Sequence, residues 1–220
     1  HKLFILYMTL STSLFIELAL KKKVLQFGDF HTKAGRNSPY FFNLGAFSDG
    51  ESLKHLGEFY ANKIIATKIK FDMIFGPAYK GIPLVSSTSI ALANRGKGAP
   101  YSFNRKEVKD HGEGGEIIGS AIKGNVLVID DVISAGTSIN ESYNLIHKNK
   151  AKIAGVIVAI DRQEKGKTLL SATQEIAKKY SIPVISIITL EDIINYLETS
   201  NSFPNELELI KKYQNTYGVI

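Results

Sequence analysis

One apolar segment that ends in two adjacent carboxylates constrains this chain more than any other feature. Residues 126–129 are all aliphatic, Asp130 and Asp131 follow them, and residues 132–138 are small, aliphatic or hydroxyl-bearing. A continuous apolar run of this kind is typical of a strand that is buried on both faces of a parallel sheet. The two acids are then expected at the carboxyl end of that strand, where open α/β sheets bind their ligands.

The turn after the two acids has the properties of a phosphate-binding site. Residues 134–138 open a segment whose apolar spacing, Ile139, Tyr143 and Ile146, predicts a helix over 137–149. The unpaired N–H groups and the positive dipole end of such a helix bind phosphate. Carboxylates can accept hydrogen bonds from two vicinal ribose hydroxyls, so the segment suits a sugar phosphate. A simple polar turn is the alternative, but a buried acid pair is costly without a ligand.

Strand-like segments alternate with helical periods from residue 51 onwards. The expected strands are 73–75, 101–103, 126–130, 153–160 and 183–188, and the expected helices are 51–69, 81–94, 137–149 and 169–180, followed by terminal helices. This alternation predicts an α/β fold with a doubly wound, mostly parallel sheet. Two short strands at 24–31 and 40–44 flank a turn and predict a small N-terminal hood, mainly residues 8–48.

Length and composition favour a single domain, residues 8–220, that binds a small anionic substrate. The 220 residues include no cysteine, which excludes disulfides and thiolate metal sites and fits a cytoplasmic protein. The net charge of +6 would permit a nucleic-acid partner, but the cations are scattered rather than gathered on one face. Residues 3–20 are too often interrupted by polar groups for a membrane span and predict a docking helix. Met8 marks residues 1–7 as an expected extension.

Two further segments place cations near the same edge of the sheet. Residues 76–81, Gly-Pro-Ala-Tyr-Lys-Gly, follow a short strand, and Lys80 can contact a diphosphate. Residues 105–116 are too polar and too rich in glycine to pack, so they predict a long irregular loop, which in a compact domain is usually functional. The cations of this loop are Arg105, Lys106, Lys109 and His111. They could stabilise the charge of a departing diphosphate, although most charged runs are merely solvated.

Several segments carry a resemblance to a known family, among them residues 76–81, which resemble its pyrophosphate-binding loop, and residues 161–164. Residues 126–138 resemble the phosphoribosyl-diphosphate (PRPP) signature of the type I phosphoribosyltransferases. Residues 27–43 and 104–114 resemble the hood and the catalytic loop of the orotate phosphoribosyltransferases of the shorter bacterial and fungal kind, and the resemblance extends from about Leu14 onwards. It implies transfer of the 5-phosphoribosyl group from PRPP to orotate, which yields orotidine 5′-monophosphate and diphosphate on the way to UMP. It also implies Mg²⁺ as cofactor and a homodimer with shared active sites.

The resemblance assigns roles to residues that the pattern alone leaves open. Catalysis is expected from Lys109, Arg105, Lys106 and His111. PRPP binding is expected from the same four cations and from Lys33, Tyr79, Lys80, Asp130, Asp131, Val132, Ile133, Ser134, Ala135, Gly136, Thr137 and Ser138. Orotate binding is expected from Phe41, Phe42, Ser134 and Arg162, and no direct protein ligand of the metal is predicted. Without the resemblance, an aromatic pair in a strand indicates core, and an arginine at a strand end indicates a partner acid.

Two other functions are compatible with parts of the pattern. A phosphoribosyltransferase for a purine or uracil would share the PRPP segment but not the hood or Arg162. A regulator that binds nucleic acid is permitted by the positive net charge, but the intact catalytic loop and the lack of an added nucleic-acid-reading domain argue against it. Ser134 stands where similar enzymes often carry threonine, and it keeps the hydroxyl group.

Overall fold

The computed structural model describes the backbone of residues 2–32, 34–109, 115–166 and 168–219, and the side chains of these residues except 2–10, 108 and 109. In chain order the elements are α1 (Lys2–Lys21), β1 (Leu25–His31), β2 (Asn37–Phe42), the short 3-10 helix η1 (Leu44–Ala46), α2 (Gly50–Thr67), β3 (Met73–Gly76), α3 (Gly81–Ala93), β4 (Tyr101–Lys109), β5 (Gly115–Gly119), β6 (Asn125–Ile129), α4 (Thr137–Lys148), β7 (Lys152–Asp161), α5 (Ala172–Tyr180), β8 (Val184–Thr189), α6 (Leu190–Ser200) and α7 (Pro204–Tyr217).

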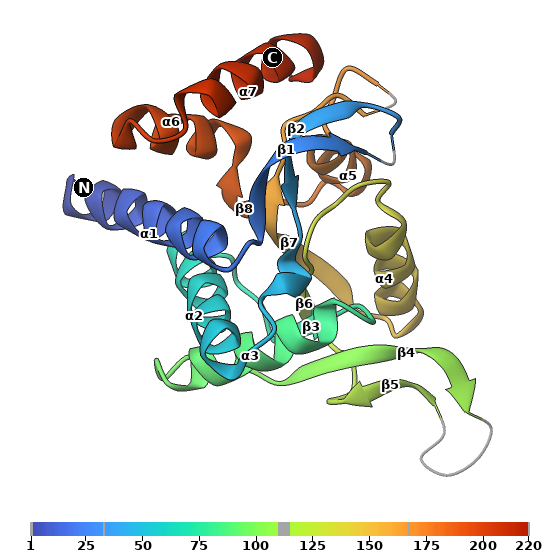
Figure 1. Cartoon of the computed structure of the whole chain (residues 1–220). Coiled ribbons are helices and arrows are strands. Elements are labelled where there is room, and N and C mark those ends of the chain that lie inside the picture. Colours follow the sequence, from blue (N-terminus) through green and yellow to red (C-terminus); the bar gives the residue numbers. More distant parts are fainter. Residues whose placement is uncertain (1, 33, 110–114, 167, 220) are drawn as a thin grey trace.

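A six-stranded sheet with strand order β5-β4-β3-β6-β7-β8 forms the centre of the fold. Within the described residues the β4–β5 pair of this sheet is antiparallel, and its other neighbouring strands are parallel. Helices α4 and α5 pack on one face, while α1, α2, α3, α6 and α7 gather on the other (Figure 1). The predicted α/β fold with a doubly wound, mostly parallel sheet is therefore confirmed.

Strand β6 is buried on both faces, as its apolar sequence predicts. Leu127 and Ile129 join the core cluster on the α2–α3 side, whereas Val126 and Val128 join the cluster under α4. All four side chains are fully buried. Because side chains alternate between the faces of a strand, the apolar run fixes β6 in the middle of the sheet and leaves the next two residues, Asp130 and Asp131, at its carboxyl edge.

The N-terminal hairpin of β1 and β2 packs against the C-terminal end of the chain. Phe27 of β1 pairs with Tyr40 of β2 in an antiparallel register. The Tyr40 ring lies edge-on to Tyr213 of α7 with centroids 6.2 Å apart, and the Phe27 ring lies 5.1 Å from that of Phe203. The predicted hairpin is present, although its second strand begins earlier than expected, and the C-terminal helices complete the hood.

The expectation of a wholly irregular loop over residues 105–116 is wrong at both ends. Strand β4 continues to Lys109, β5 begins at Gly115, and these two residues pair across the hairpin. The polar composition correctly predicts that the two strands of this hairpin, which we call the β4–β5 arm, have no hydrophobic core of their own at Lys106, which is exposed. Pairing of Asn104 with Ile117 and of Lys109 with Gly115 nevertheless joins the two strands, with a register irregularity between these pairs. Residues 110–114 lie outside the described part of the chain.

The first helix extends further than the predicted docking segment. α1 begins at Lys2, so its backbone includes most of the residues expected to form an extension. Its buried residues Phe15, Ile16 and Ala19 join the large core cluster, which confirms docking. Among the described helices, none combines the length and the apolar character that a bilayer crossing needs.

Candidate active site

The two acids after β6 are buried and tied to the turn that follows them. Asp130 and Asp131 are only 5% and 9% exposed. The Asp130 carboxylate accepts hydrogen bonds from the Asp131 backbone N–H at 2.9 Å and from the Ser138 hydroxyl at 2.8 Å. The hydroxyl of Tyr60, on α2, donates to the Asp130 carbonyl at 2.8 Å. The carboxylate of Asp130 therefore connects the end of β6 to the first turn of α4.

Burial perturbs the ionisation of Asp130 and of the neighbouring Tyr60. Loss of solvent contact raises the pKa of Asp130 to about 6, and the neighbouring charge of Asp131 adds to the rise, whereas the hydrogen bond from Ser138 opposes it. Burial likewise holds the pKa of the Tyr60 hydroxyl well above its usual value, and the charges of both acids add to that shift. An acid held in this way gains from a ligand that donates hydrogen bonds to it.

The loop between β3 and α3 brings a cation to the acid pair. Lys80 Nζ lies 2.7 Å from Asp131 Oδ2. Gly76 and Gly81 pack so closely that a side chain at Gly76 would collide with the Gly81 carbonyl, so the loop requires glycine at this position. The Ala78 N–H donates to the Asn104 side chain at 2.8 Å. The loop is thus fixed by its backbone, while the Lys80 side chain stays 66% exposed.

Residues 132–138 line a cavity at the start of α4. The cavity has a volume of about 200 Å³ and is bordered by Asp130 and by every residue from Val132 to Ile139. Gly136 adopts φ +72°, a conformation that favours glycine, and a side chain there would meet Ile176 at 2.9 Å. All seven residues predicted to hold the 5′-phosphate therefore face one hollow, next to the acid pair.

Arg162 lies at the end of β7 and is already paired in this structure. Its Nε donates to Glu164 Oε1 at 2.9 Å, and its Nη2 lies 2.6 Å from the same oxygen. Nη2 also donates to the Ser38 hydroxyl at 3.1 Å, and the guanidinium stacks over the Tyr40 ring at 4.1 Å. The partner acid expected for an arginine at a strand end is thus present, and contact with orotate stays a prediction.

The two phenylalanines predicted to line the orotate pocket point to opposite sides of the hood. Phe41 is 42% exposed and stacks on Phe30 at a centroid distance of 5.3 Å. Phe42 is 9% exposed and lies in the core beside Phe15. Because neighbouring residues of a strand alternate in direction, the structure leaves only the Phe41 ring on an open surface, and a role for either in orotate binding stays a prediction.

The described loop cations lie apart from the acid pair, on the β4–β5 arm. Arg105 and Lys106 line a cavity of about 220 Å³ beside α4, and Lys106 Nζ contacts Glu141 Oε2 at 2.8 Å. The predicted catalytic residue Lys109 ends β4, but its side chain is outside the described atoms. Lys33 and His111 lie outside the described residues.

Three residues of the site were given no role from the sequence. Asn104 orders the Lys80 loop, Tyr60 binds the carbonyl of Asp130, and Glu164 pairs with Arg162. Tyr60 has the periodicity of a core residue and Asn104 stands in a polar run, so neither pattern marks a site. Glu164 follows Arg162 by two residues, and this close spacing of opposite charges could have been used to predict an ion pair.

Comparison with known proteins identifies the family. Residues 44–181 match the phosphoribosyl transferase domain family. The chain is 57% identical to orotate phosphoribosyltransferase of Nitrosomonas europaea over 93% of its length and 90% of the relative, and 54% identical to that of Vibrio cholerae over 93% and 97%. The crystal structure of orotate phosphoribosyltransferase from Francisella tularensis superposes with a TM-score of 0.85 at 45% identity, covering 93% of this chain and 99% of that one. The chain therefore belongs to the phosphoribosyltransferase family and, within it, to the orotate phosphoribosyltransferases.

Proposed function

We propose that this chain transfers the 5-phosphoribosyl group of PRPP to orotate, giving orotidine 5′-monophosphate and diphosphate. The observation that carries the proposal is the buried acid pair Asp130 and Asp131 at the carboxyl end of β6, beside the cavity lined by residues 132–138. Carboxylates accept hydrogen bonds from vicinal ribose hydroxyls, and the N–H groups at the start of α4 suit the 5′-phosphate. The relatives described above carry the same activity in their names.

In this mechanism the bond from the anomeric carbon to diphosphate breaks as a bond from the orotate ring nitrogen forms, and the proton of that nitrogen passes to solvent or to the departing diphosphate. Positive charge develops on the ribose ring and negative charge on the departing diphosphate. Lys80, Arg105 and Lys106, together with Lys109 and His111, would stabilise the departing diphosphate. Closure of the β4–β5 arm over the site would exclude water, which otherwise competes for the cationic carbon.

The contact between Lys80 and Asp131 supports an exchange of partners on binding. Asp131 is needed by the ribose hydroxyls, and Lys80 is needed by the diphosphate. The side chain of Lys80 is 66% exposed and that of Asp131 is 12% exposed. An ion pair with one exposed member contributes little to stability, so PRPP can separate the pair at low cost and leave each group with a substrate partner.

We assign the β4–β5 arm to the active site of a second copy of the chain. The arm extends away from the body of the molecule along the edge of the sheet (Figure 1). Its cation Lys106 contacts Glu141 rather than the acid pair. A homodimer with shared sites would place the arm of one subunit over the PRPP site of its partner.

The residues present fit Mg²⁺ as the cofactor. The carboxylate of Asp130, at the edge of the cavity, and that of the adjacent Asp131 are hard oxygen donors, which this cation prefers. Among the described residues there is no group of three or more metal-binding side chains, so bound substrate and water would supply most ligands. The ion would neutralise part of the diphosphate charge.

The test is an assay of orotate consumption. Loss of orotate absorbance is expected only when PRPP and Mg²⁺ are both present, and uracil, hypoxanthine and adenine are expected to give no product. Turnover of one of those bases in place of orotate would instead favour a phosphoribosyltransferase of different specificity. Lack of turnover with salt-sensitive binding to RNA or DNA would favour a nucleic-acid-binding regulator. The cytoplasmic location expected from the sequence stays a prediction.

A further inference from the structure

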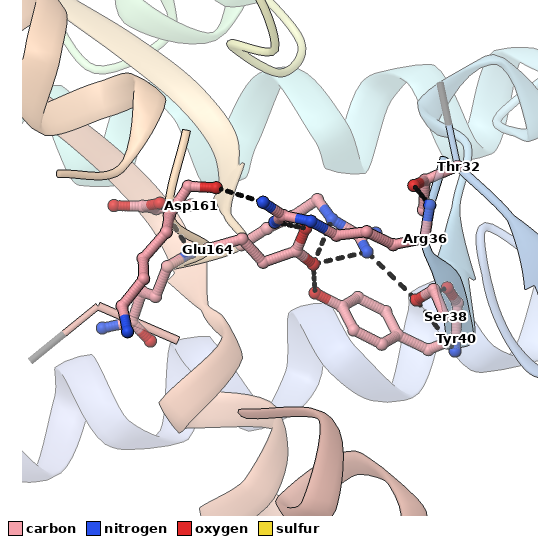
Figure 2. Close-up of polar contacts among 9 residues, drawn as sticks. Thr32, Arg36, Ser38, Tyr40, Asp161 and Glu164 are labelled. Carbon is pink, nitrogen blue, oxygen red and sulfur yellow. Dashed lines mark hydrogen bonds and ion pairs between the residues drawn. The ribbon is translucent and has the colours of Figure 1, made fainter. Parts of the chain in front are cut away.

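Glu164 is a partly buried acid that contacts both the hood and Arg162 at the end of β7. Its side chain is 15% exposed. Besides the two Arg162 nitrogens, its Oε1 accepts a hydrogen bond from the Tyr40 hydroxyl at 3.2 Å. Figure 2 shows this carboxylate facing Tyr40 and lying close to Arg36, both of which belong to the hood. Glu164 is therefore held from two sides and has little freedom to turn away.

The contacts of Arg162 divide its guanidinium into an edge that binds a carboxylate and an edge that binds a neutral hydroxyl. Glu164 Oε1 takes the edge formed by Nε and Nη2. On the second edge, formed by Nη1 and Nη2, the Ser38 hydroxyl accepts a hydrogen bond from Nη2 at 3.1 Å. A carboxylate can bind the edge formed by Nη1 and Nη2 with two parallel hydrogen bonds. Glu164 thus leaves to a neutral hydroxyl the edge that suits an anionic substrate, and a carboxylate can replace that hydroxyl.

The local charge also favours an added anion. Arg36 Nη1 lies 3.9 Å from Glu164 Oε2, and Arg36 Nη2 donates to the Lys165 carbonyl at 2.9 Å. Two guanidinium groups therefore share one carboxylate, which leaves one positive charge uncompensated within this cluster. Removing Glu164 would raise the positive charge but would also release the guanidinium of Arg162 from its fixed orientation.

We propose that Glu164 is a positioning residue for Arg162. It fixes the guanidinium by one edge, against the Tyr40 ring, so that the other edge is presented to the carboxylate of orotate. This inference rests on the proposed function, in which Arg162 binds orotate. Glu164 itself need not touch the substrate, and its effect should therefore disappear when Arg162 is absent.

The experiment compares Glu164→Gln, Arg162→Ala and the double variant in steady-state kinetics with both substrates. Glu164→Gln keeps the size of the side chain and removes its charge. The KM for orotate is expected to rise roughly ten- to hundredfold, as for loss of a hydrogen bond to a charged group, while the KM for PRPP stays unchanged. In the Arg162→Ala background, Glu164→Gln is expected to raise the orotate KM by less than about twofold, because coupled residues are not additive.

The outcomes separate this inference from the proposal on which it rests. If Arg162→Ala raises the orotate KM and Glu164→Gln does not, only the positioning role is overturned. If Arg162→Ala leaves orotate use unchanged, the assigned role of Arg162 fails as well. An equal rise in the KM of both substrates, or additive effects in the double variant, would show that Glu164 acts on the fold instead.

Two further variants complete the experiment, one as a surface control and one as a second test of the contact with Glu164. Glu198→Gln removes a surface carboxylate that pairs with Lys211 on α7 and is expected to leave both KM values unchanged. Tyr40→Phe removes one hydroxyl donor to Glu164 and keeps the ring under Arg162. It is expected to raise the orotate KM by a smaller factor, roughly two- to tenfold. If Glu164→Gln does not fold, an unchanged orotate KM in Tyr40→Phe overturns the proposal.

Discussion

The carboxyl edge of the sheet around Asp130 and the β4–β5 arm differ in how their charged groups are held. At the sheet edge Asp130 is 5% exposed, and its carboxylate is fixed by hydrogen bonds from Asp131 and Ser138. On the arm, Lys106 contacts Glu141 through side chains that are 38% and 54% exposed. The first region is organised by burial, whereas the second carries its cations on paired strands with solvent around them.

This difference indicates a division of labour between binding and chemistry. A cavity with buried acids and a glycine-shaped turn is assembled before the substrate arrives, so it can provide affinity for the ribose phosphate. Exposed ion pairs contribute only about 0–1 kcal/mol, so the arm can exchange its surface partners for a diphosphate at little cost. We therefore expect substitutions at the sheet edge to alter PRPP affinity and substitutions on the arm to alter turnover.

The largest effect is expected from Lys109→Ala on the arm. Loss of a cation that stabilises the departing diphosphate should lower kcat by roughly 10²–10³-fold, while the KM for PRPP changes little. Single-turnover and steady-state kinetics on the same preparation will separate the two quantities. A rise in the PRPP KM with unchanged kcat would erase the distinction between the two regions.

Subunit mixing shows whose site the arm serves. Lys80→Ala and Lys109→Ala are each expected to be nearly inactive, Lys80 acting in its own site and Lys109 in the partner's. A mixed dimer would then contain one site with both defects and one with neither, so activity should reappear when subunits exchange. If verified heterodimers regain no activity, the arm acts within its own subunit.

The next effect is expected from Asp131→Asn at the sheet edge. The amide keeps the shape of the side chain but offers a donor where a ribose hydroxyl needs an acceptor. The KM for PRPP should rise roughly ten- to hundredfold, with thermal melting close to that of the parent. Asp29→Asn, at an exposed position of the hood, is the matched control and should change neither quantity. Full turnover at low PRPP in Asp131→Asn would show that the acid pair does not hold the sugar.

A third effect concerns the stability of the ligand-free protein. Burial raises the pKa of Asp130 from 3.8 to about 6. Between these values the folded state keeps a proton that the unfolded carboxyl releases, so the free energy of unfolding falls as pH rises through this window. Asp130→Asn cannot ionise, and its amide can accept from the Asp131 N–H and donate to the Ser138 hydroxyl. At pH 7 the variant should be more stable than the parent by roughly 1–3 kcal/mol.

Chemical denaturation at several pH values measures this difference. The gain in stability should vanish below pH 3.8, where the carboxyl of the parent is protonated in both states. PRPP binding by the same variant should be weakened, because an acceptor of the ribose hydroxyls is lost. A stability difference that does not depend on pH would mean that Asp130 is not desolvated at the edge of the sheet, and the contrast with the arm would weaken.

The sequence predicts the sheet edge well because its signals are local. The apolar run of β6, the acids after it and the helix that begins at Thr137 follow one another along the chain. The packing of α7 on the hood was not predictable, since it joins Tyr40 to Tyr213 across most of the sequence. Phe41 and Phe42 show a rule that could have been applied, because adjacent residues in a strand cannot share a face.

Charge alone could not locate the residues of the arm. The polar sequence around Arg105 and Lys106 predicts an irregular loop, whereas the structure places both residues within β4, between the paired residues Asn104 and Lys109. The role of Arg162 is ambiguous in a similar way, since an arginine can bind either a structural acid or a substrate carboxylate. In this structure it contacts Glu164. The local sequence identifies which groups are charged, but the tertiary fold determines which groups they contact.

The smallest effect is expected from Glu141→Gln, which removes the surface partner of Lys106. Both side chains are more than a third exposed, so the free energy of unfolding should change by no more than about 0.5 kcal/mol. The variant should also keep full turnover, because the proposed role of Lys106 requires it to leave Glu141 for the diphosphate. Denaturant melts and kcat measured side by side are sufficient to test this. A large loss of kcat would mean that the contact with Glu141 holds the arm in its active position. The arm would then depend on a fixed contact within its own chain, as Asp130 does, and the contrast between the two regions would be lost.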